Sequence, residues 1–452
     1  MNDMNTPIYD FVRKYAEGNR VRLHMPGHKG TSLLGIEKYD ITEIDGADVL
    51  YSAKGIIRES EENASAIFYS GMSLFSTEGS SLSIRAMLYL VSLYAKKKHK
   101  LPRIYAGRNA HKAFISAVSL LDLDVEWLYG ENTENPISCN ITAEYLDRQL
   151  SKTNIKPVAL YITSPDYLGN VADIKGLSEI CKKHGVLLLV DNAHGAYLSF
   201  LPVSRHPLQL GADMCCDSAH KTLPVLTGGG YLHISKEADS FLSENAEAAL
   251  SLFASTSPSY LILQSLDLAN KYILEGYKER LSAFVDEVRR VKNELSALSF
   301  TLIGDEELKI TVKTKDFGYF GYEIAEILSK ENLVCEFSDR DFITLMLSPE
   351  IGTDGLNRIV TAFSRIKRRE RITEVPPVLL SPKKSLSIRE ATLSPSAEMP
   401  VCNCKGKVLA SANVACPPAI PLLVCGEVID EAAIECLEYY GVNSVRVVVF
   451  TN

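Results

Sequence analysis

The 452-residue sequence lacks the patterns that would place it in a membrane, in a secretory route or with a nucleotide cofactor. Its N-terminus, MNDMNTPIYDFVRKY, does not show the basic-then-apolar order of a secretory signal. No apolar run approaches the roughly 18 residues that a membrane helix requires. Neither GxGxxG nor GxxxxGKS/T occurs, so no nucleotide fingerprint is present. We therefore expect a cytoplasmic protein with no membrane partner.

The composition is that of an ordinary globular protein, with 46% hydrophobic and 23% charged residues. This excludes a disordered tail, a collagen and a disulfide miniprotein, and the length allows two or three domains. The 48 basic residues are outnumbered by 56 acidic ones, which gives a net charge of −8. Because an acidic chain does not attract a phosphate backbone, we expect no nucleic-acid partner.

The ten cysteines include no CxxC pair. Free thiols in a reducing cytoplasm are the simplest interpretation. Cys402 and Cys404 have the spacing of two metal ligands, but no second pair or nearby histidine completes a site. We therefore expect no metal.

Helical and strand-like patterns alternate along the first half of the chain. Such alternation predicts a largely parallel sheet that is covered by helices on both faces. The expected helices are 81–97, 110–122 and 173–185, and the expected strands are 103–107, 124–129, 157–163, 186–191, 212–218 and 228–234.

The second half predicts a smaller α+β domain and an appended module. Residues 262–298 are mostly helical and charged, and form a bridge to that domain. A proline-bearing linker at 374–385 leads to a module that extends to Asn452. Within the smaller domain we expect strands at 307–314, 333–337 and 342–347, and helices at 320–330 and 353–370.

Two polar segments follow strand ends, where open α/β sheets place their ligands. The segment from Ser76 to Ser81 precedes a helix, so free backbone N–H groups there can bind an anion such as phosphate. The alternative is that Ser80 or Ser81 merely caps that helix. Asp191 closes the most apolar strand and could hold a metal, orient a base or pair with a protonated ring nitrogen. The alternative is that Asp191 merely caps a turn.

Two basic side chains complete the set of candidates. Lys221 lies between expected strands, in the sequence Ser-Ala-His-Lys-Thr and shortly before a run of three glycines. This setting makes it a candidate Schiff-base amine, although most lysines are surface residues. His111 begins an expected helix after a strand, and its alternative is a purely structural role.

Together these residues match what pyridoxal phosphate requires from a protein. They supply a lysine for covalent attachment, an acid for the ring nitrogen, a phosphate cup at a helix start and a ring that can stack on the cofactor. Asp191 precedes Lys221 by 30 positions. This order is typical of the aspartate-aminotransferase-like class of pyridoxal-phosphate enzymes.

Motifs along nearly the whole chain resemble those of the Orn/Lys/Arg decarboxylase family, the group-III pyridoxal-phosphate amino-acid decarboxylases. The segments that carry this resemblance are His24-Met-Pro-Gly-His-Lys29, Thr77-Glu-Gly-Ser-Ser81, Asn109-Ala-His-Lys112, Thr163-Ser-Pro-Asp-Tyr-Leu-Gly169, Ser218-Ala-His-Lys221, Arg389-Glu-Ala391 and the stretch from Pro417 to Glu427.

The resemblance implies roles for individual residues. Lys221 would bind the cofactor covalently, Asp191 would keep its ring nitrogen protonated, and His111 would stack on the ring. Lys221 or His220 would return a proton to the substrate's α-carbon. The implied cofactor-binding set is Gly79, Ser80, Ser81, His111, Asp191, Ala193, His194, Ser218, His220, Lys221 and Thr256, of which Thr256 belongs to a segment that reaches a neighbouring subunit.

The same resemblance implies a fold, a division into domains and an assembly. The expected fold is the aspartate-aminotransferase-like fold type I, with a mainly parallel seven-stranded sheet, a smaller α+β domain and an appended C-terminal module. Because the opening motif begins at His24, we expect a short form without the family's N-terminal wing domain, as a homodimer or a dimer of dimers. The expected parts are an N-terminal arm (1–64), a large cofactor domain (65–262), a bridge and small domain (263–373) and a C-terminal module (374–452).

The implied activity is decarboxylation of lysine, arginine or ornithine to the corresponding amine, a polyamine precursor. No local motif selects among these substrates. Glu390 and Glu427 are candidates for the substrate's distal cation, and structural charges are their alternative. A pyridoxal-phosphate aminotransferase or lyase is the main rival, for which Arg340 or Arg358 would bind the α-carboxylate. A non-catalytic binding protein of this fold is the other rival.

Overall fold

A computed structural model describes residues 5–131, 138–377, 381–412 and 420–449 of the chain. The chain divides into two compact units. The first comprises Met1–Lys100 and Leu187–Leu281, and the second comprises Leu101–Val186 and Ser282–Asn452. Cys416 and the first three residues of the expected Pro417–Glu427 motif lie outside the described residues.

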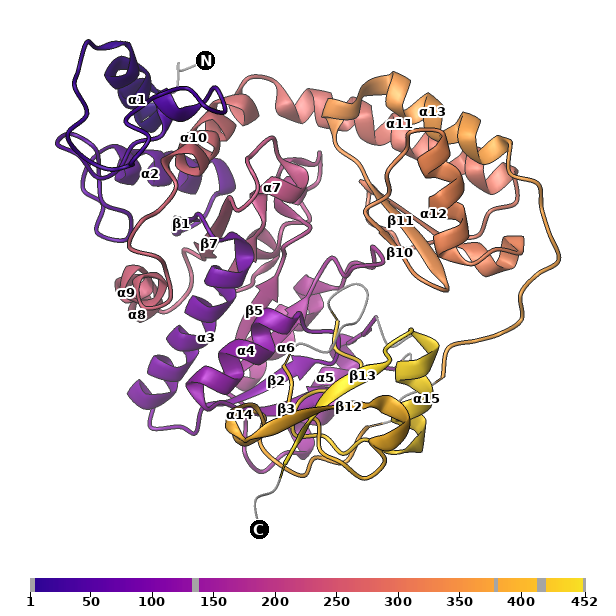
Figure 1. The fold of residues 1–452 in the computed structure, drawn as a ribbon. Helices are drawn as coiled ribbons and strands as arrows, with labels where there is room; N and C mark the ends of the chain where they lie inside the picture. The colour runs from indigo at the N-terminus through magenta and orange to yellow at the C-terminus, as the bar shows by residue number, and fades with distance from the viewer. Residues whose placement is uncertain (1–4, 132–137, 378–380, 413–419, 450–452) are drawn as a thin grey trace. The chain divides into compact units, whose positions relative to one another are not determined.

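The central element is a seven-stranded sheet with the strand order β1-β7-β6-β5-β4-β2-β3 (Figure 1). The pairs β2–β3, β2–β4 and β5–β6 are parallel, whereas β7 is antiparallel to both of its neighbours. The mainly parallel α/β sheet expected from the sequence is therefore confirmed. Its strands are β1 (Met72–Ser76), β2 (Arg103–Gly107), β3 (Asp124–Leu128), β4 (Ala159–Thr163), β5 (Leu187–Asp191), β6 (Met214–Asp217) and β7 (Gly230–Ile234).

In the first unit, helix α3 (Gly79–Lys97) runs along the sheet and contacts β1, β5, β6 and β7 (Figure 1). Most of its apolar residues from Leu82 to Ala95 are buried, as their helical spacing predicts. The other helices of this unit are α1 (Pro7–Glu17), α2 (Ile56–Phe68), α7 (Ala219–Thr222), α8 (Ser240–Glu244), α9 (Ala246–Ser251) and α10 (Tyr260–Leu274).

A buried carboxylate holds the N-terminal helix α1 in place. Asp267 on α10 is fully buried, and one of its oxygens accepts hydrogen bonds from the backbone N–H groups of Ile8 and Tyr9, both at 2.9 Å. Its other oxygen accepts from the hydroxyl of Ser60 on α2, at 2.6 Å. Asp267 thus supplies the acceptor for free N–H groups at the start of α1.

Burial raises the pKa of Asp267 to about 6, although these hydrogen bonds lower it. In the folded state Asp267 therefore binds its proton more tightly than in the unfolded chain, where an aspartate has its ordinary pKa of 3.8. Its contribution to stability is present in full below pH 3.8 and is lost as the pH rises through about 6.

We predict that Asp267→Asn removes this pH dependence. Denaturant unfolding at a series of pH values should show the wild type losing about 3 kcal/mol of unfolding free energy, relative to the variant, between pH 3.5 and pH 7. A difference between the two proteins that stays constant over this range would show that Asp267 titrates normally.

In the second unit, three helices accompany the strands β2, β3 and β4: α4 (Lys112–Leu121), α5 (Ala143–Lys152) and α6 (Ile174–His184). Asp173 begins α6 by accepting a hydrogen bond from the N–H of Gly176, at 3.0 Å. Gly185 ends the helix with a φ of 66°, as the sequence predicts.

The smaller domain of the second unit contains a four-stranded antiparallel sheet in the order β10-β11-β9-β8. Its strands are β8 (Leu302–Ile303), β9 (Lys309–Lys313), β10 (Phe337–Ser338) and β11 (Phe342–Met346), and its helices are α12 (Gly321–Lys330) and α13 (Gly352–Ser364). The bridging helix α11 (Tyr277–Ala297) leads into this domain.

Two predicted boundaries in this domain are wrong. The helix expected over 353–370 ends at Ser364, because Arg369 and Ile372 donate backbone hydrogen bonds to the carbonyls of Phe317 and Lys315 instead of continuing it. The strand expected over 333–337 is reduced to Phe337–Ser338. Leu333 instead closes the end of α12, through a backbone hydrogen bond to Leu328.

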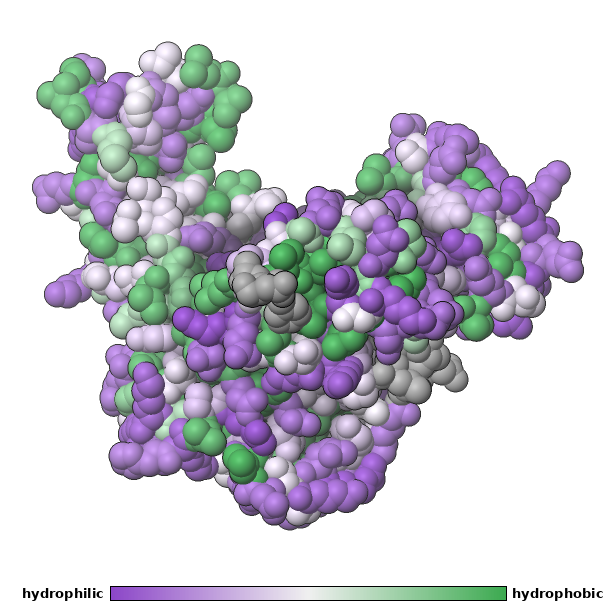
Figure 2. Space-filling view, turned by 60° about the horizontal axis from the view of Figure 1, so that its bottom comes forward, coloured by the Kyte–Doolittle hydropathy of each residue, from purple (hydrophilic) through white to green (hydrophobic). Residues whose placement is uncertain are grey.

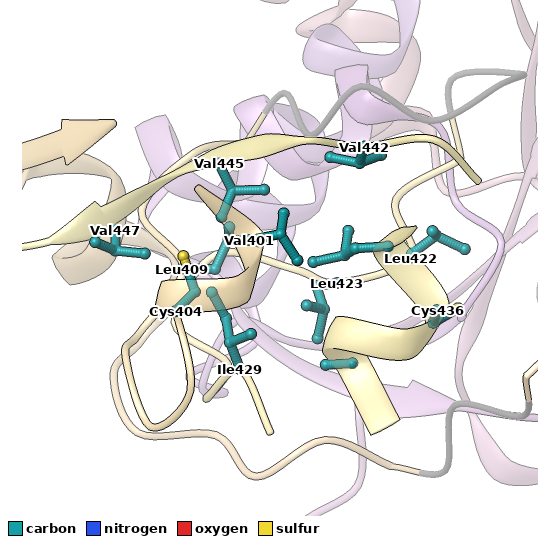
Figure 3. Close-up of a cluster of buried hydrophobic side chains, with 12 residues drawn as sticks. Val401, Cys404, Leu409, Leu422, Leu423, Ile429, Cys436, Val442, Val445 and Val447 are labelled. Atoms are coloured by element: carbon teal, nitrogen blue, oxygen red, sulfur yellow. The ribbon is translucent and has the colours of Figure 1, made fainter. Parts of the chain in front are cut away.

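The C-terminal segment has a hydrophobic core of its own. This core is built on α15 (Glu431–Tyr439), on β13 (Ser444–Val448) and on the loops beside them (Figure 3). Cys404 is fully buried in this core, whereas Cys402 is exposed, so the two thiols lie in different surroundings. The remaining elements of the segment are α14 (Ile388–Leu393) and β12 (Ser396–Pro400), which pairs with β13.

All nine cysteines that the structure describes are free thiols. Within the described ranges, no helix has both the length and the apolar character needed to cross a bilayer.

Candidate functional site

Asp191 and the segment from Ser218 to Lys221 follow two neighbouring strands of the first unit. Strands β5 and β6 are parallel, with Asp191 opposite Cys216, so their carboxyl ends lie at the same edge of the sheet. The Asp191 side chain is buried, and its Oδ1 accepts from the N–H of Ala193 at 3.2 Å and from the Cys216 thiol at 3.6 Å. A carboxylate held in this way is available to a cationic ring at the strand ends.

Lys221 lies on the short helix α7 and is half-buried. Its Nζ is 2.8 Å from Nε2 of His194, which follows Asp191 by three positions. Because an ammonium group only donates, Nε2 of His194 is the acceptor when Lys221 is charged. The turn after β5 and the helix after β6 thus meet at the lysine that the sequence singles out.

The expected phosphate cup lies in the same unit. Helix α3 begins at Gly79, has no acidic residue in its first turn, and has no side-chain cap among the described residues. Ser218 Oγ donates to Ser80 Oγ at 2.9 Å, which brings hydroxyl groups from β6 to this helix end. His220 is adjacent too, because a Cβ on Gly79 would lie 3.6 Å from its ring.

Glycines allow the close approach on which this cup depends. Gly79 has a φ of 66°, a conformation that other residues rarely adopt, and its N–H donates to the carbonyl of Gly228 at 2.6 Å. A Cβ on Gly230 would lie 2.7 Å from the carbonyl oxygen of Asp217. The glycine run after Lys221 therefore brings the start of β7 against the loop that opens α3.

The polar groups of this site fit the parts of pyridoxal phosphate. An uncapped helix N-terminus with serine hydroxyls beside it suits a phosphate dianion, and a buried carboxylate at a strand end suits a protonated pyridine nitrogen. Lys221, which follows both in the sequence, supplies the amine. The structure brings together nine of the expected site residues in the first unit: Gly79, Ser80, Ser81, Asp191, Ala193, His194, Ser218, His220 and Lys221.

The other two expected residues are His111 and Thr256. His111 belongs to the second unit, where its Nδ1 accepts from the N–H of Ala113 at 3.1 Å and caps α4. Thr256 is exposed in the first unit. Its neighbour Ser255 donates its N–H to Oε1 of Glu78 at 2.8 Å, which ties the Thr256 segment to the loop before α3. The stacking role of His111 and the intersubunit role of Thr256 stay predictions.

The residues proposed for a dibasic substrate's distal group have structural contacts instead. Glu390 caps α14, since its carboxylate accepts from the N–H of Ser387 at 2.8 Å. Glu427 is buried and its Oε2 lies 3.0 Å from the guanidinium of Arg108. These contacts support the structural alternative for both glutamates.

The two arginines considered for an aminotransferase are also engaged. Arg340 forms a bidentate pair with Glu374, at 3.0 and 3.2 Å. Arg358 donates to the backbone carbonyls of Glu331 and Asn332, at the end of α12. Neither arginine is therefore positioned to bind the α-carboxylate of a substrate.

The Arg108–Glu427 pair anchors the C-terminal segment to the loop before His111. Arg108 also donates to the carbonyls of Pro421 and Leu422, at 3.0 and 2.9 Å, and lies over the Trp127 ring. Burial raises the pKa of Glu427, and the Arg108 cation opposes this rise. The carboxylate therefore depends on its partner to stay ionised.

We predict that Arg108→Met lowers the unfolding free energy by about 3–5 kcal/mol, because it leaves the Glu427 charge buried without its cation. Denaturant unfolding measures this loss. The double variant Arg108→Met with Glu427→Gln should recover part of it, since no charge then remains to be buried. Equal stability of the wild type and the single variant would contradict the anchoring role.

The first unit also contains a buried cluster of titratable side chains that no sequence motif predicts. His206, Asp217 and His233 bring their ligand-type atoms within 4.8 Å of one another. Within the described residues this is the one such group with metal-ligand geometry, and Cys402 and Cys404 do not form part of it. An aspartate in the otherwise apolar strand β6 is the only signal that the sequence offered.

The chain is similar to known decarboxylases along nearly its whole length. Residues 6–312 match the model of the Orn/Lys/Arg decarboxylase family, major domain. The arginine decarboxylase of Bacillus subtilis is 27% identical over 95% of this chain and 92% of its own, and that of Halalkalibacterium halodurans is 28% identical over 94% and 91%.

Among solved structures, the lysine decarboxylase of Francisella novicida has the same fold. Its TM-score is 0.80 over 99% of this chain and 82% of its own, at 18% identity. The fold type I architecture expected from the motifs is thus confirmed. With the family match covering residues 6–312, the chain belongs to the Orn/Lys/Arg decarboxylase family.

Proposed function

We propose that this protein uses pyridoxal phosphate to remove the α-carboxylate of a basic amino acid, which yields carbon dioxide and a di- or polyamine precursor. The observation that carries the proposal is the meeting of Asp191, Lys221 and the Gly79–Ser80 cup at one sheet edge of the first unit. The two arginine decarboxylases support the reaction type and a basic substrate.

Each part of the cofactor has a residue to hold it. Gly79, Ser80 and Ser81 at the start of α3, with Ser218 and His220, would bind the phosphate. Lys221 would bind the cofactor's aldehyde carbon, and Ala193 would lie against one face of the ring, with His111 stacked on the other. When bound, the cofactor supplies the electron sink into which the bond to the carboxylate can break.

Asp191 and Lys221 perform distinct tasks. The Asp191 carboxylate holds a proton on the ring nitrogen by charge pairing, within a buried environment that strengthens the pairing. The Lys221 amine, whose Nζ lies 2.8 Å from Nε2 of His194, would release the cofactor to an incoming amine and return a proton to the α-carbon.

His220 is the second candidate for the returned proton. Its Nδ1 lies 2.9 Å from the carbonyl oxygen of Gly229, which can only accept, so Nδ1 carries a proton. A neutral His220 therefore presents an Nε2 lone pair, and a charged one presents an Nε2 proton. Its place beside Gly79 supports a contact with the phosphate as well.

The test of this proposal is turnover with a panel of substrates. Purified protein with pyridoxal phosphate is incubated with lysine, ornithine and arginine, and carbon dioxide and the matching amine are quantified. We expect equal amounts of both from at least one of the three. A keto acid without carbon dioxide would point to an aminotransferase, and no turnover would point to a binding protein.

We further propose that the working form is a homodimer or a dimer of dimers. Six apolar side chains on the N-terminal arm are exposed in the single chain: Val21, Leu23, Met25, Leu33, Leu34 and Ile36. Figure 2 shows that hydrophobic residues interrupt the hydrophilic surface on one face of the molecule. Apolar surface of this kind commonly marks a protein interface.

Light scattering on size-exclusion fractions tests the assembly. We expect a mass of at least two chains, and a shift toward one chain on substituting Leu33 and Leu34 together by lysine. A monomeric wild type with full activity would contradict both the dimer and the intersubunit role of Thr256.

A further inference from the structure

A buried carboxylate closes strand β6, directly before the segment that carries Lys221. Oδ1 of Asp217 accepts from Nδ2 of Asn192 at 2.7 Å. Oδ2 lies 3.1 Å from Nε2 of His206 and 3.4 Å from Nε2 of His233. All four side chains are fully buried. We call these residues, with Ser73, the Asp217 network.

The protons of this network can be assigned from its contacts. Nδ1 of His233 lies 2.7 Å from the Ser73 hydroxyl, which in turn is 2.6 Å from the Ser70 hydroxyl. When Ser73 donates to Nδ1, Nε2 of His233 carries the proton and lies 3.4 Å from Oδ2 of Asp217, near it but outside hydrogen-bond geometry. Burial lowers the pKa of His233, and hydrogen bonds and charge from the two histidines hold the pKa of Asp217 well below its usual range.

An ionised carboxylate is a costly feature for a protein interior. Removing such a charge from water costs several kcal/mol unless good hydrogen bonds compensate it. Here Asn192 and His206 donate to the two oxygens of Asp217, and Nε2 of His233 lies 3.4 Å from one of them. The free energy spent on burying the Asp217 carboxylate points to a role for this charge at the junction of β5 and β6.

On one side, Asp217 fixes the turn that follows β5. Asn192, its hydrogen-bond partner, directly follows Asp191. The Asn192 side-chain amide also lies against Gly195, where a Cβ would be only 2.0 Å from Oδ1, and the backbone carbonyl of Asn192 accepts from the Gly195 N–H at 2.8 Å. The orientation of Asn192 therefore sets the turn that contains Ala193 and His194.

On the other side, Asp217 is continuous with the segment that holds the cofactor lysine. Ser218 follows it at once and donates to Ser80 in the phosphate cup, and Lys221 lies one helical turn further on. The two sides meet again at the contact between Lys221 and His194. The turn after β5 is thus joined to the end of β6 and α7 at two points. One is the Asp217–Asn192 hydrogen bond, and the other is the Lys221–His194 contact.

We propose that Asp217 is a positioning residue for the decarboxylation, which sets Asp191 and Lys221 relative to each other through Asn192 and the buried histidines. The inference rests on the proposed function and adds a residue that contacts neither substrate nor cofactor. Because small misplacements of reacting groups lower rates steeply, the network should affect turnover more than substrate binding.

The strand β6 supplies a matched control. Asp213, four positions earlier, also joins β6 to β5, because its Oδ2 accepts from the N–H of Leu188 at 2.7 Å. It does so at the amino end of the strand, away from Lys221. Asp213→Asn therefore changes the same residue type on the same strand pair without touching the site.

The decisive variant is Asp217→Asn. An amide can accept from Asn192 through its oxygen, but its NH2 group then faces the two imidazole donors, so one side of the network must rearrange. In the holoenzyme we expect kcat to fall about 100-fold at saturating cofactor, with KM changed by less than about threefold. The visible circular dichroism band of the Lys221-bound cofactor should change as well, whereas Asp213→Asn should leave kcat and this band unchanged.

A second variant and two further outcomes also decide the proposal. If Asp217→Asn does not fold, Asn192→Ser breaks the same bond with less disturbance and carries the same expectation. Variants that lower the melting temperature but keep the wild-type kcat and dichroism band would overturn the proposal in favour of a purely structural role. If the wild type decarboxylates none of the three amino acids, the proposed function fails, and the dichroism band still decides whether Asp217 positions the cofactor lysine.

Discussion

Replacing Lys221 with alanine is expected to lower kcat by roughly 10⁴-fold or more, the scale seen when a covalent catalytic group is removed. The variant loses the amine that binds the cofactor, and it loses a candidate donor for the proton returned to the α-carbon. Borohydride reduction of the wild type should fix the cofactor to the chain, and peptide mapping by mass spectrometry should find it on Lys221. The variant should carry no such adduct.

Lys112→Ala is the matched control for this experiment. Lys112 ends a second Ala-His-Lys sequence, at 110–112, and its side chain is exposed. We expect this variant to keep the reducible cofactor adduct and the wild-type kcat. An adduct that persists in Lys221→Ala would mean that another lysine binds the cofactor, and the assignment of the site would be wrong.

The second large effect is expected at Asp191. Asp191→Asn keeps the shape of the side chain but removes the charge that holds a proton on the ring nitrogen. We expect kcat to fall about 10³-fold, in line with the loss of a preorganised electrostatic partner in a buried site. Steady-state kinetics at saturating cofactor measures this effect, and Asp191→Glu should restore part of the activity because it restores the charge.

The adduct at Lys221 should still form in Asp191→Asn, because the lysine and the phosphate cup are unchanged. This separates the Asp191 prediction from the Lys221 prediction. An Asp191→Asn enzyme with wild-type kcat would show that the ring nitrogen needs no anionic partner, and would remove Asp191 from the mechanism.

The site could be predicted from the sequence because its parts are local. Asp191 and the Ser218–Lys221 segment each follow an apolar strand whose pattern is plain, whereas β1, the strand before Gly79, is not among the expected strands. A parallel sheet then brings strand ends to one edge without further information. The same logic explains why strands β2 to β7 were found close to their true bounds.

The parts that escaped prediction depend on distant partners. His233 meets Ser73 across 160 positions and Ile8 meets Asp267 across 259, so no window of sequence contains either pair. Helix α1 is absent from the expected elements, and its start is held by a partner far away in the sequence, Asp267 on α10. For Glu427, the sequence could not separate a substrate contact from the buried pair with Arg108 that the fold creates.

The central claim is that this chain breaks the bond between the α-carbon and the carboxylate, and that the chain's own groups replace the carboxylate with a proton. Turnover of a basic amino acid in D2O, with the products analysed by mass spectrometry, tests it most directly. We expect one carbon dioxide for each amine, and an amine that carries a single deuterium on the former α-carbon. A keto acid, or an amino acid that returns deuterated with its carboxylate intact, would contradict it.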